Sequence, residues 1–199
     1  MIPIRDLYQD HLFTERMPAM TPHQLKIKNT SRYIAVLLKI GLAVFIVIAL
    51  LALAAIGILL FSSEHTKASF LAAFQVTANN GTVLEIAPRP LLIMFLFMLA
   101  DALLIMTAVF FIHGIFHDLQ NGCTPFTRQN TARIQIVAAI TIVLSIVGGC
   151  SDALVDYYTI GGLTWHINAI GLISGLIIYC ISFIFRYGCD LQQASDETL

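Results

Sequence analysis

The sequence predicts an all-helical integral membrane protein with four transmembrane helices. Of its 199 residues, 58% are hydrophobic and only 12% are charged, whereas a soluble domain carries about 25% charged residues. The charges gather between long apolar runs. A spanning helix needs about 20 apolar residues to cross a hydrocarbon core roughly 30 Å thick. Lipid leaves unpaired backbone groups unsatisfied, so runs of this length are expected to be helices.

Four apolar runs meet this requirement and divide the chain. The predicted spans are residues 40–61, 91–112, 134–151 and 165–185. The first run is too long for a cleavable signal peptide and is expected to stay as an anchor. We expect a polar N-terminal segment and one membrane domain. The polar segment covers residues 1–32, and the membrane domain covers residues 33–199. Within the membrane domain we expect an outer loop (62–90), a cytoplasmic turn (117–133) and a cytoplasmic tail (186–199).

The distribution of Lys and Arg predicts that both termini lie in the cytoplasm. Nine of these residues fall before the first span, in the turn or in the tail, and only Lys67 and Arg89 fall on the other side. Basic residues are enriched in cytoplasmic loops. The outer loop is expected to form a small extracytoplasmic cap. Within it, residues 82–86 alternate polar and apolar positions as a strand does, and residues 156–160 are the candidate partner strand.

Small residues in the last two spans predict close helix packing. Gly171 and Gly175 form a GxxxG pair, and Ser145 and Gly149 are spaced in the same way. Such pairs let helix backbones approach closely in lipid. The packing is expected either within the chain or between protomers.

The segment between the second and third spans predicts a tightly capped helical turn. Gly122 is placed to end the second helix, and Pro125 disfavours helix just before it. Thr127 is a suitable N-cap, with Asn130 in the place of the capping-box Glu or Gln. Phe126 then projects from the turn. The residues alone favour a hairpin with Phe126 tucked against the bundle, and a docking surface is the second interpretation.

The same residues carry a resemblance to a known family. The stretch from Gly122 to Asn130 resembles the G-x-PFT-x-EN turn of a bacterial membrane family catalogued as domain of unknown function 2975. The tail from Phe185 to Leu199 is similar to that family's closing F-x-x-G-x-x-LQ-x-E-x-D-x-T pattern. The resemblance covers about residues 30–199, and Gln129 stands where the family has Glu.

The resemblance implies a location and a partner. Members are small inner-membrane proteins without an assigned activity, often encoded beside a small helix-turn-helix regulator of the Cro/CI type. A non-enzymatic membrane partner or sensor of such a regulator is therefore expected, in the bacterial inner membrane. The residues expected to bind the partner on the cytoplasmic face are Pro125, Phe126, Thr127, Asn130, Gly188, Leu191 and Gln192. Leu191 is expected to lie against Phe126.

Asp101 is the one carboxylate inside a predicted span. A charge near the bilayer centre costs about 2.5–3.5 kcal/mol, so this residue should face the bundle interior, pair with a donor or be protonated. Structural, ligand-binding and proton-linked roles remain open. The alternative function is therefore a small transporter, channel or immunity-type protein that works through Asp101.

Other chemistry finds little support in the residues. Catalytic fingerprints are absent, the four cysteines form no CxxC pair, and no cofactor is expected. His113, His117 and Asp118 share one helix face, but no further ligand makes a metal site there. Asp152 and Asp156 are interpreted as a solvated rim beyond the third span. The net charge of −1 gives no reason to expect direct nucleic-acid binding, so the expected partners are the lipid bilayer, the regulator and a second copy of the chain.

Overall fold

A computed structural model describes most of the chain: residues 22–74, 76–77, 83–84, 87–121, 124–160, 162 and 167–197. It describes the backbone without side chains at residues 22–28, 76–77, 83–84, 159–160 and 196. The helix end predicted at Gly122 lies outside the described residues, as does the predicted start of the fourth span at Trp165.

The structure is helical, apart from one minimal strand pair. In chain order the elements are α1 (Pro22–Phe61), α2 (Glu64–Ala72), β1 (Val76–Thr77), β2 (Val83–Leu84), α3 (Pro88–Gln120), α4 (Arg128–Ile160) and α5 (Ala169–Asp196). The helices long and apolar enough to cross a membrane are α1, α3, α4 and α5. The prediction of four apolar helices is therefore confirmed.

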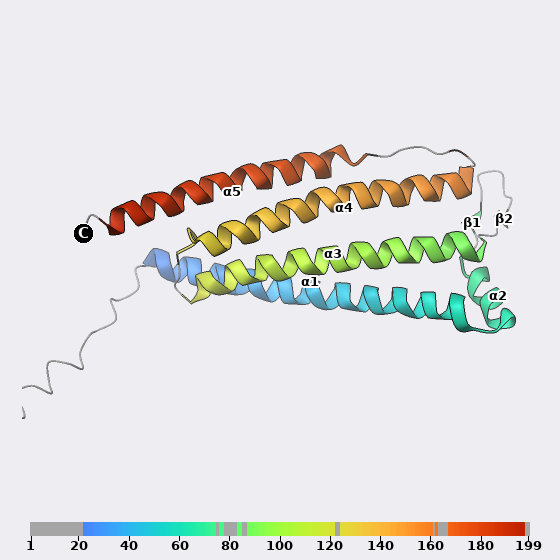
Figure 1. The fold of residues 1–199 in the computed structure, drawn as a ribbon. Helices are drawn as coiled ribbons and strands as arrows, with labels where there is room; N and C mark the ends of the chain where they lie inside the picture. Colours follow the sequence, from blue (N-terminus) through green and yellow to red (C-terminus); the bar gives the residue numbers. More distant parts are fainter. Residues whose placement is uncertain are drawn as a thin grey trace, which may run out of the picture.

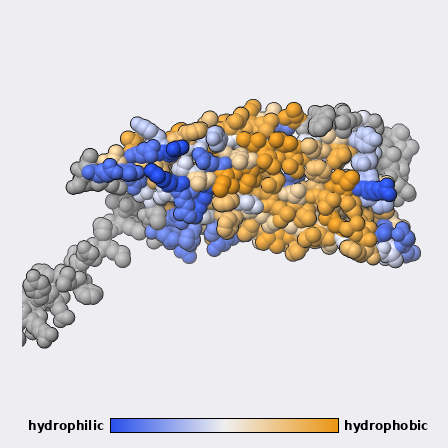
Figure 2. Space-filling view, viewed as in Figure 1, coloured by the Kyte–Doolittle hydropathy of each residue, from blue (hydrophilic) through white to orange (hydrophobic). Residues whose placement is uncertain are grey.

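The long helices extend beyond the apolar runs that predicted them, and all four do so at the same end of the molecule (Figure 1). Hydrophilic residues gather at that end, while apolar residues cover the middle (Figure 2). Polar helix-forming residues continue the hydrogen-bonded ladder after the hydrophobic run has ended. We call this the polar end and define it as residues 22–39, 113–121, 124–133 and 186–197.

The four long helices lie in an open row. Extensive contacts join α1 to α3, α3 to α4, and α4 to α5, so each long helix packs on the next one along the chain (Figure 1). Among the described residues, no comparable contact joins α1 to α4 or α5. Neighbours in the row run antiparallel, which leaves α1 and α5 as its two edges.

Mostly small side chains form the α1 contact face. Buried residues recur at intervals of three or four positions along this helix, as one helical face requires: Ala49, Ala52, Ala55 and Leu59. Large side chains such as Leu50 and Leu51 point outward and are exposed. This division, with small residues between helices and large apolar residues outside, is the one expected for helices that pack in lipid.

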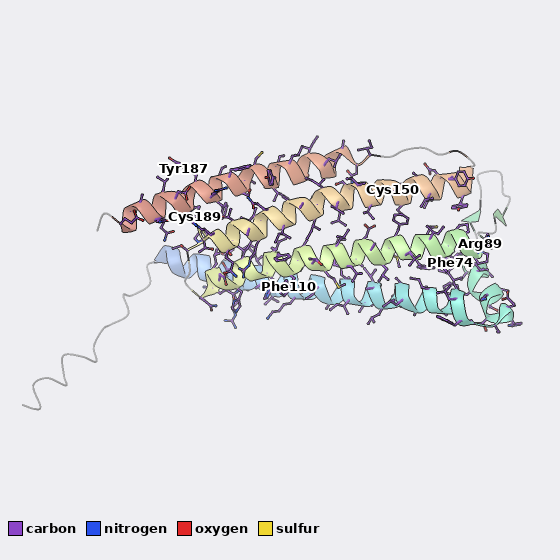
Figure 3. All side chains as sticks on the ribbon, viewed as in Figure 1. Phe74, Arg89, Phe110, Cys150, Tyr187 and Cys189 are labelled. Carbon is purple, nitrogen blue, oxygen red and sulfur yellow. The ribbon has the colours of Figure 1, made fainter. Side chains whose placement is uncertain are left out.

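The end opposite the polar end holds α2 and the strand pair. Ser63 caps α2, with its Oγ accepting a hydrogen bond from Thr66 N at 3.5 Å. The rings of Phe70 and Phe74 pack on Phe95 of α3, with centroid distances of 6.2 and 5.6 Å. This aromatic cluster holds the connection against the helices, near the labelled Phe74 and Arg89 in Figure 3.

The predicted partner of the short strand is wrong. Residues 156–160 are the last turns of α4, and β2 pairs instead with β1, antiparallel, with Val76 opposite Leu84. Helix continues through this region because no Gly or Pro lies between Gly149 and Gly161. Asp152 therefore lies within α4 rather than beyond its end.

Candidate docking site at the polar end

The turn between α3 and α4 begins α4 with a side-chain cap. Thr127 Oγ1 accepts a hydrogen bond from Asn130 N at 3.1 Å, which confirms the predicted N-cap. The predicted capping box is wrong, because the Asn130 side chain does not return to Thr127. Its Nδ2 instead donates to Pro125 O at 3.4 Å. Asn is one methylene shorter than the Gln or Glu of a capping box, and here it braces the turn from inside.

A partly buried ion pair links α3 to α4 behind this turn. Arg133 Nη1 donates to Asp118 Oδ2 at 2.5 Å and to Asn130 Oδ1 at 3.0 Å. The Asp118 and Arg133 side chains are 27% and 19% exposed, and Asn130 is fully buried. Charge-assisted hydrogen bonds are about twice as strong as neutral ones. The Pro125 carbonyl, Asn130, Arg133 and Asp118 thus form a continuous chain that fixes the turn.

Further hydrogen bonds connect the polar end from one helix to the next. Gln120 Nε2 of α3 donates to Ser31 O of α1 at 3.0 Å. On the other side, Thr124 Oγ1 donates to Gln192 Oε1 of α5 at 3.2 Å. Thr131 Oγ1 and Cys189 Sγ, 3.8 Å apart, join α4 to α5. These bonds hold α1, α3, α4 and α5 in one arrangement at this end.

Phe126 packs on α5. Its ring centroid is 5.4 Å from that of Phe185, and it covers Gly188, where an added Cβ would come within 2.5 Å of Phe126 Cδ1. Phe126 nevertheless remains 41% exposed. Leu191 was expected to lie against it, but the ring packs one helical turn earlier. Leu191 is 53% exposed.

A shallow, open groove lies beside Phe126, between the turn and the end of α5. It has a volume of about 340 Å³ and is lined by Phe126, Arg128, Cys189, Gln192, Gln193 and Glu197. We call it the docking groove. Of the residues expected to bind a partner, Phe126 and Gln192 line the groove, and Gly188 lies under the Phe126 ring. The expectation is wrong for Asn130, because its side chain is fully buried and cannot contact a partner.

The predicted packing residues lie between α4 and α5. A Cβ added at Gly171 would collide with Ser145 Oγ, and one at Gly175 would lie 2.5 Å from Ile142 Cγ1. Ser145 and Gly149 are buried. The close approach of these two helices therefore occurs within one chain.

Asp101 lies in the middle of α3, away from the docking groove. Its Oδ1 is buried, and no hydrogen-bond partner is found for it within the described part of the chain. Asp152, the nearest acidic residue of α4 in sequence to the end of its apolar run, lies directly after residue 151. The Asp152 side chain is exposed, whereas Asp101 Oδ1 is buried.

The structure brings no further metal ligand to the helix face that carries His113, His117 and Asp118, within the described residues. His113 and His117 stack with ring centroids 6.3 Å apart, while Asp118 is engaged by Arg133. No group of three or more metal-binding side chains occurs in the portion that the structure describes.

Sequence reasoning missed the pairing of Asp118 with Arg133. Asp118 lies near the end of α3 and Arg133 near the start of α4, on either side of the turn that joins these antiparallel helices. That placement could have predicted the pair. Arg133 was instead interpreted through its effect on orientation, and Asp118 through the histidine face. Cys189 was missed as a groove residue because a single cysteine carries no pattern.

Comparison with known proteins adds no relative: no family model, no curated protein and no solved structure matches the chain. The resemblance to the family of unknown function 2975, and the partner that it implies, therefore stay predictions.

Proposed function

We propose that the protein is a non-enzymatic membrane partner or sensor that holds a small helix-turn-helix regulator at its polar end. In this proposal the polar end faces the cytoplasm of a bacterial cell, as the distribution of Lys and Arg indicates. The chain spans the inner membrane four times, and α2 with the strand pair forms an extracytoplasmic cap.

The observation that carries the proposal is the docking groove on a rigid polar platform. Hydrogen bonds and an ion pair fix the turn to α3, α4 and α5, so the groove is formed before a partner arrives. A preformed site loses less conformational freedom on binding.

The lining of the groove suits a helical partner. Phe126 supplies an exposed aromatic surface, while Arg128, Gln192 and Glu197 supply polar groups around it. An amphipathic helix places its apolar face in such a groove and its polar residues at the rim. A small helix-turn-helix protein offers surface helices of this kind.

Photo-crosslinking from Leu191 in native membranes tests the proposal. This side chain is exposed next to Gln192 of the groove, and replacing it disturbs no described packing of Phe126. Ile184 is the matched control, since it lies seven residues earlier on the same helix face and is 66% exposed within the apolar run.

The expected result is a crosslink from position 191, but not from position 184, to a small helix-turn-helix protein identified by mass spectrometry. A Phe126→Ala variant should insert normally and lose this crosslink. Capture of only lipid or a second copy of the chain at position 191 would contradict the regulator proposal.

One observation favours the alternative, a small transporter, channel or immunity-type protein that works through Asp101. Asp101 Oδ1 is buried and has no hydrogen-bond partner within the described residues. An intramembrane carboxylate without a hydrogen-bond partner is suited to binding a proton or a cation. The effect of Asp101→Asn, described below, separates this function from the first.

A further inference from the structure

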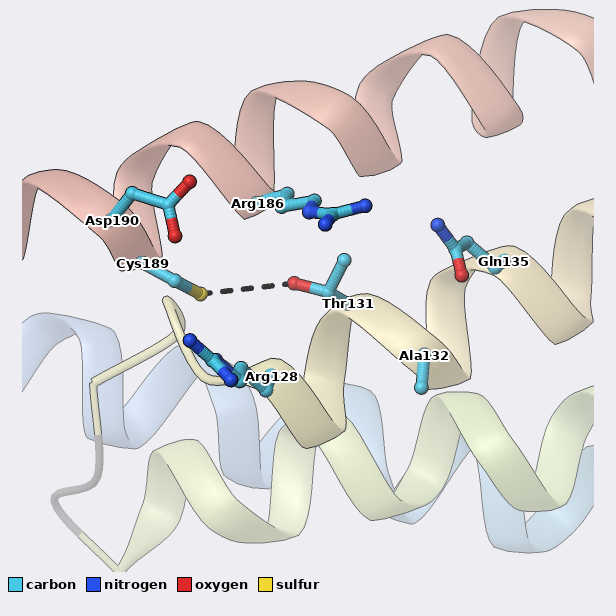
Figure 4. A pocket seen from close by; sticks show the side chains of 7 residues that line it. All are labelled: Arg128, Thr131, Ala132, Gln135, Arg186, Cys189 and Asp190. Atoms are coloured by element: carbon cyan, nitrogen blue, oxygen red, sulfur yellow. Dashed lines mark hydrogen bonds between the residues drawn. The ribbon is translucent and has the colours of Figure 1, made fainter.

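A second hollow at the polar end lies between the first turns of α4 and the last turns of α5 (Figure 4). Its volume is about 260 Å³, and its lining is more strongly charged than that of the docking groove. The lining residues are Arg128, Thr131, Ala132, Gln135, Arg186, Cys189 and Asp190. We call it the arginine pocket.

The two arginines come from different helices and have no ion-pair partner among the described residues. Arg128 begins α4, and Arg186 lies on α5, where its side chain extends toward Gln135 (Figure 4). Arg133 offers the contrast, because Asp118 neutralises it. Asp190 is the one acidic residue in the lining, so the pocket keeps a positive excess.

The pocket lies where the apolar runs end. Arg186 directly follows the run of α5, and Gln135 lies at the start of the run of α4. In a bilayer this level is that of the lipid headgroups. Exposed apolar side chains lie beyond the pocket toward the middle of the helices: Phe183 precedes Arg186 by three residues, and Val143 follows Gln135 by eight.

We propose that the arginine pocket binds the phosphate of an anionic lipid headgroup. The planar guanidinium groups of Arg128 and Arg186 match phosphate oxygens in pairs, and the Gln135 amide adds a further donor. The acyl chains then lie along the exposed residues near Phe183 and Val143. Basic pockets between membrane helices are suited to anionic headgroups, and the positive excess disfavours a headgroup that carries its own cation.

Native mass spectrometry of the full-length protein, released from detergent, tests this site. The protein is titrated separately with phosphatidylglycerol, phosphatidylcholine and inorganic phosphate. The expected result is phosphatidylglycerol binding at least about tenfold tighter than phosphatidylcholine binding, with no competition from millimolar phosphate. Losing two charge-assisted hydrogen-bonding groups in Arg128→Gln/Arg186→Gln should weaken that binding by about tenfold or more.

Three further variants serve as controls for lipid binding in the arginine pocket. Arg89→Gln removes a cation at the opposite end of α3 and should leave phosphatidylglycerol binding unchanged. Arg128→Lys/Arg186→Lys keeps the charge without the paired geometry, so its affinity should fall between the wild type and the glutamine variant. Asp190→Asn removes the acidic group of the lining and should tighten binding.

Several results overturn the assignment. Equal binding of the two lipids excludes an anionic-lipid site, and so does an unchanged affinity in Arg128→Gln/Arg186→Gln. Displacement of phosphatidylglycerol by millimolar inorganic phosphate would mean that the pocket binds free phosphate instead. If Arg89→Gln weakened binding equally, the loss would come from the lower net charge of the protein and not from the arginine pocket. Because lipid binding is measured without a protein partner, its failure leaves the proposed regulator function untouched.

Discussion

The ring of Phe126 occupies the space in which a side chain at position 188 would lie. A Cβ built on Gly188 would meet Phe126 Cδ1 at 2.5 Å and Cε1 at 2.9 Å. The turn between α3 and α4 and the end of α5 therefore fit together only because residue 188 is glycine.

Replacing Gly188 with alanine should destabilise the polar end. Phe126 must move to make room, and overpacking of this kind costs about 1–3 kcal/mol. We expect a lower midpoint of thermal unfolding in detergent, together with greater cleavage of the turn by protease. Gly57→Ala is the control, since nothing lies within 4 Å of its added Cβ. An unchanged Gly188→Ala variant would show that the ring is not held in this position.

The Asp118–Arg133 pair should stabilise the fold measurably. Removing one partner leaves the other partly buried without its charge-assisted hydrogen bond, at a cost of about 1–3 kcal/mol. A double-mutant cycle with Asp118→Asn and Arg133→Gln, measured by unfolding in detergent, gives the coupling energy directly.

The pair Glu64–Lys67 on α2 offers an internal comparison for this cycle. Its N–O distance is 3.1 Å, but the Glu64 side chain is 92% exposed. Such surface pairs contribute about 0–1 kcal/mol. We therefore expect clearly stronger coupling for Asp118–Arg133, and equal coupling in the two cycles would contradict a structural role for that pair.

The Asp101→Asn variant should accumulate in the membrane at least as well as the wild type. It replaces a carboxylate that lacks a hydrogen-bond partner in the described residues, and a charge at mid-bilayer costs about 2.5–3.5 kcal/mol. Crosslinking from position 191 should be unchanged in this variant. If a transport or protection phenotype disappears while crosslinking and accumulation persist, the alternative function through Asp101 is favoured.

The apolar runs predicted the number and approximate position of the long helices, because a bilayer requires uninterrupted hydrophobic length. They could not predict where the helices end. The third span was expected over residues 134–151, yet α4 reaches from Arg128 to Ile160. Helix propensity and capping set those limits, as at Thr127, and they act on polar residues that hydropathy ignores.

The sequence predicted that the turn meets the tail, but it predicted the contacts between them less well. Phe126, Gly188 and Gln192 come together, whereas Leu191 is exposed and Asn130 is buried. Phe126 therefore contacts α5 about one helical turn before the predicted position, at Gly188 instead of Leu191. The position of α5 along α4 depends on how the two helices pack around Gly171 and Gly175. That packing cannot be read from the sequence alone.

The open row of helices also determines how the chain can assemble. Each long helix has its extensive contacts with the previous or the next one, so contacts follow the order of synthesis. The α1–α3 hairpin can form before α4 leaves the ribosome, and α4 can dock before α5 is made. Only the last step brings Gln192 to Thr124 and Gly188 under Phe126. The groove and the arginine pocket thus come into existence together, when the final helix arrives.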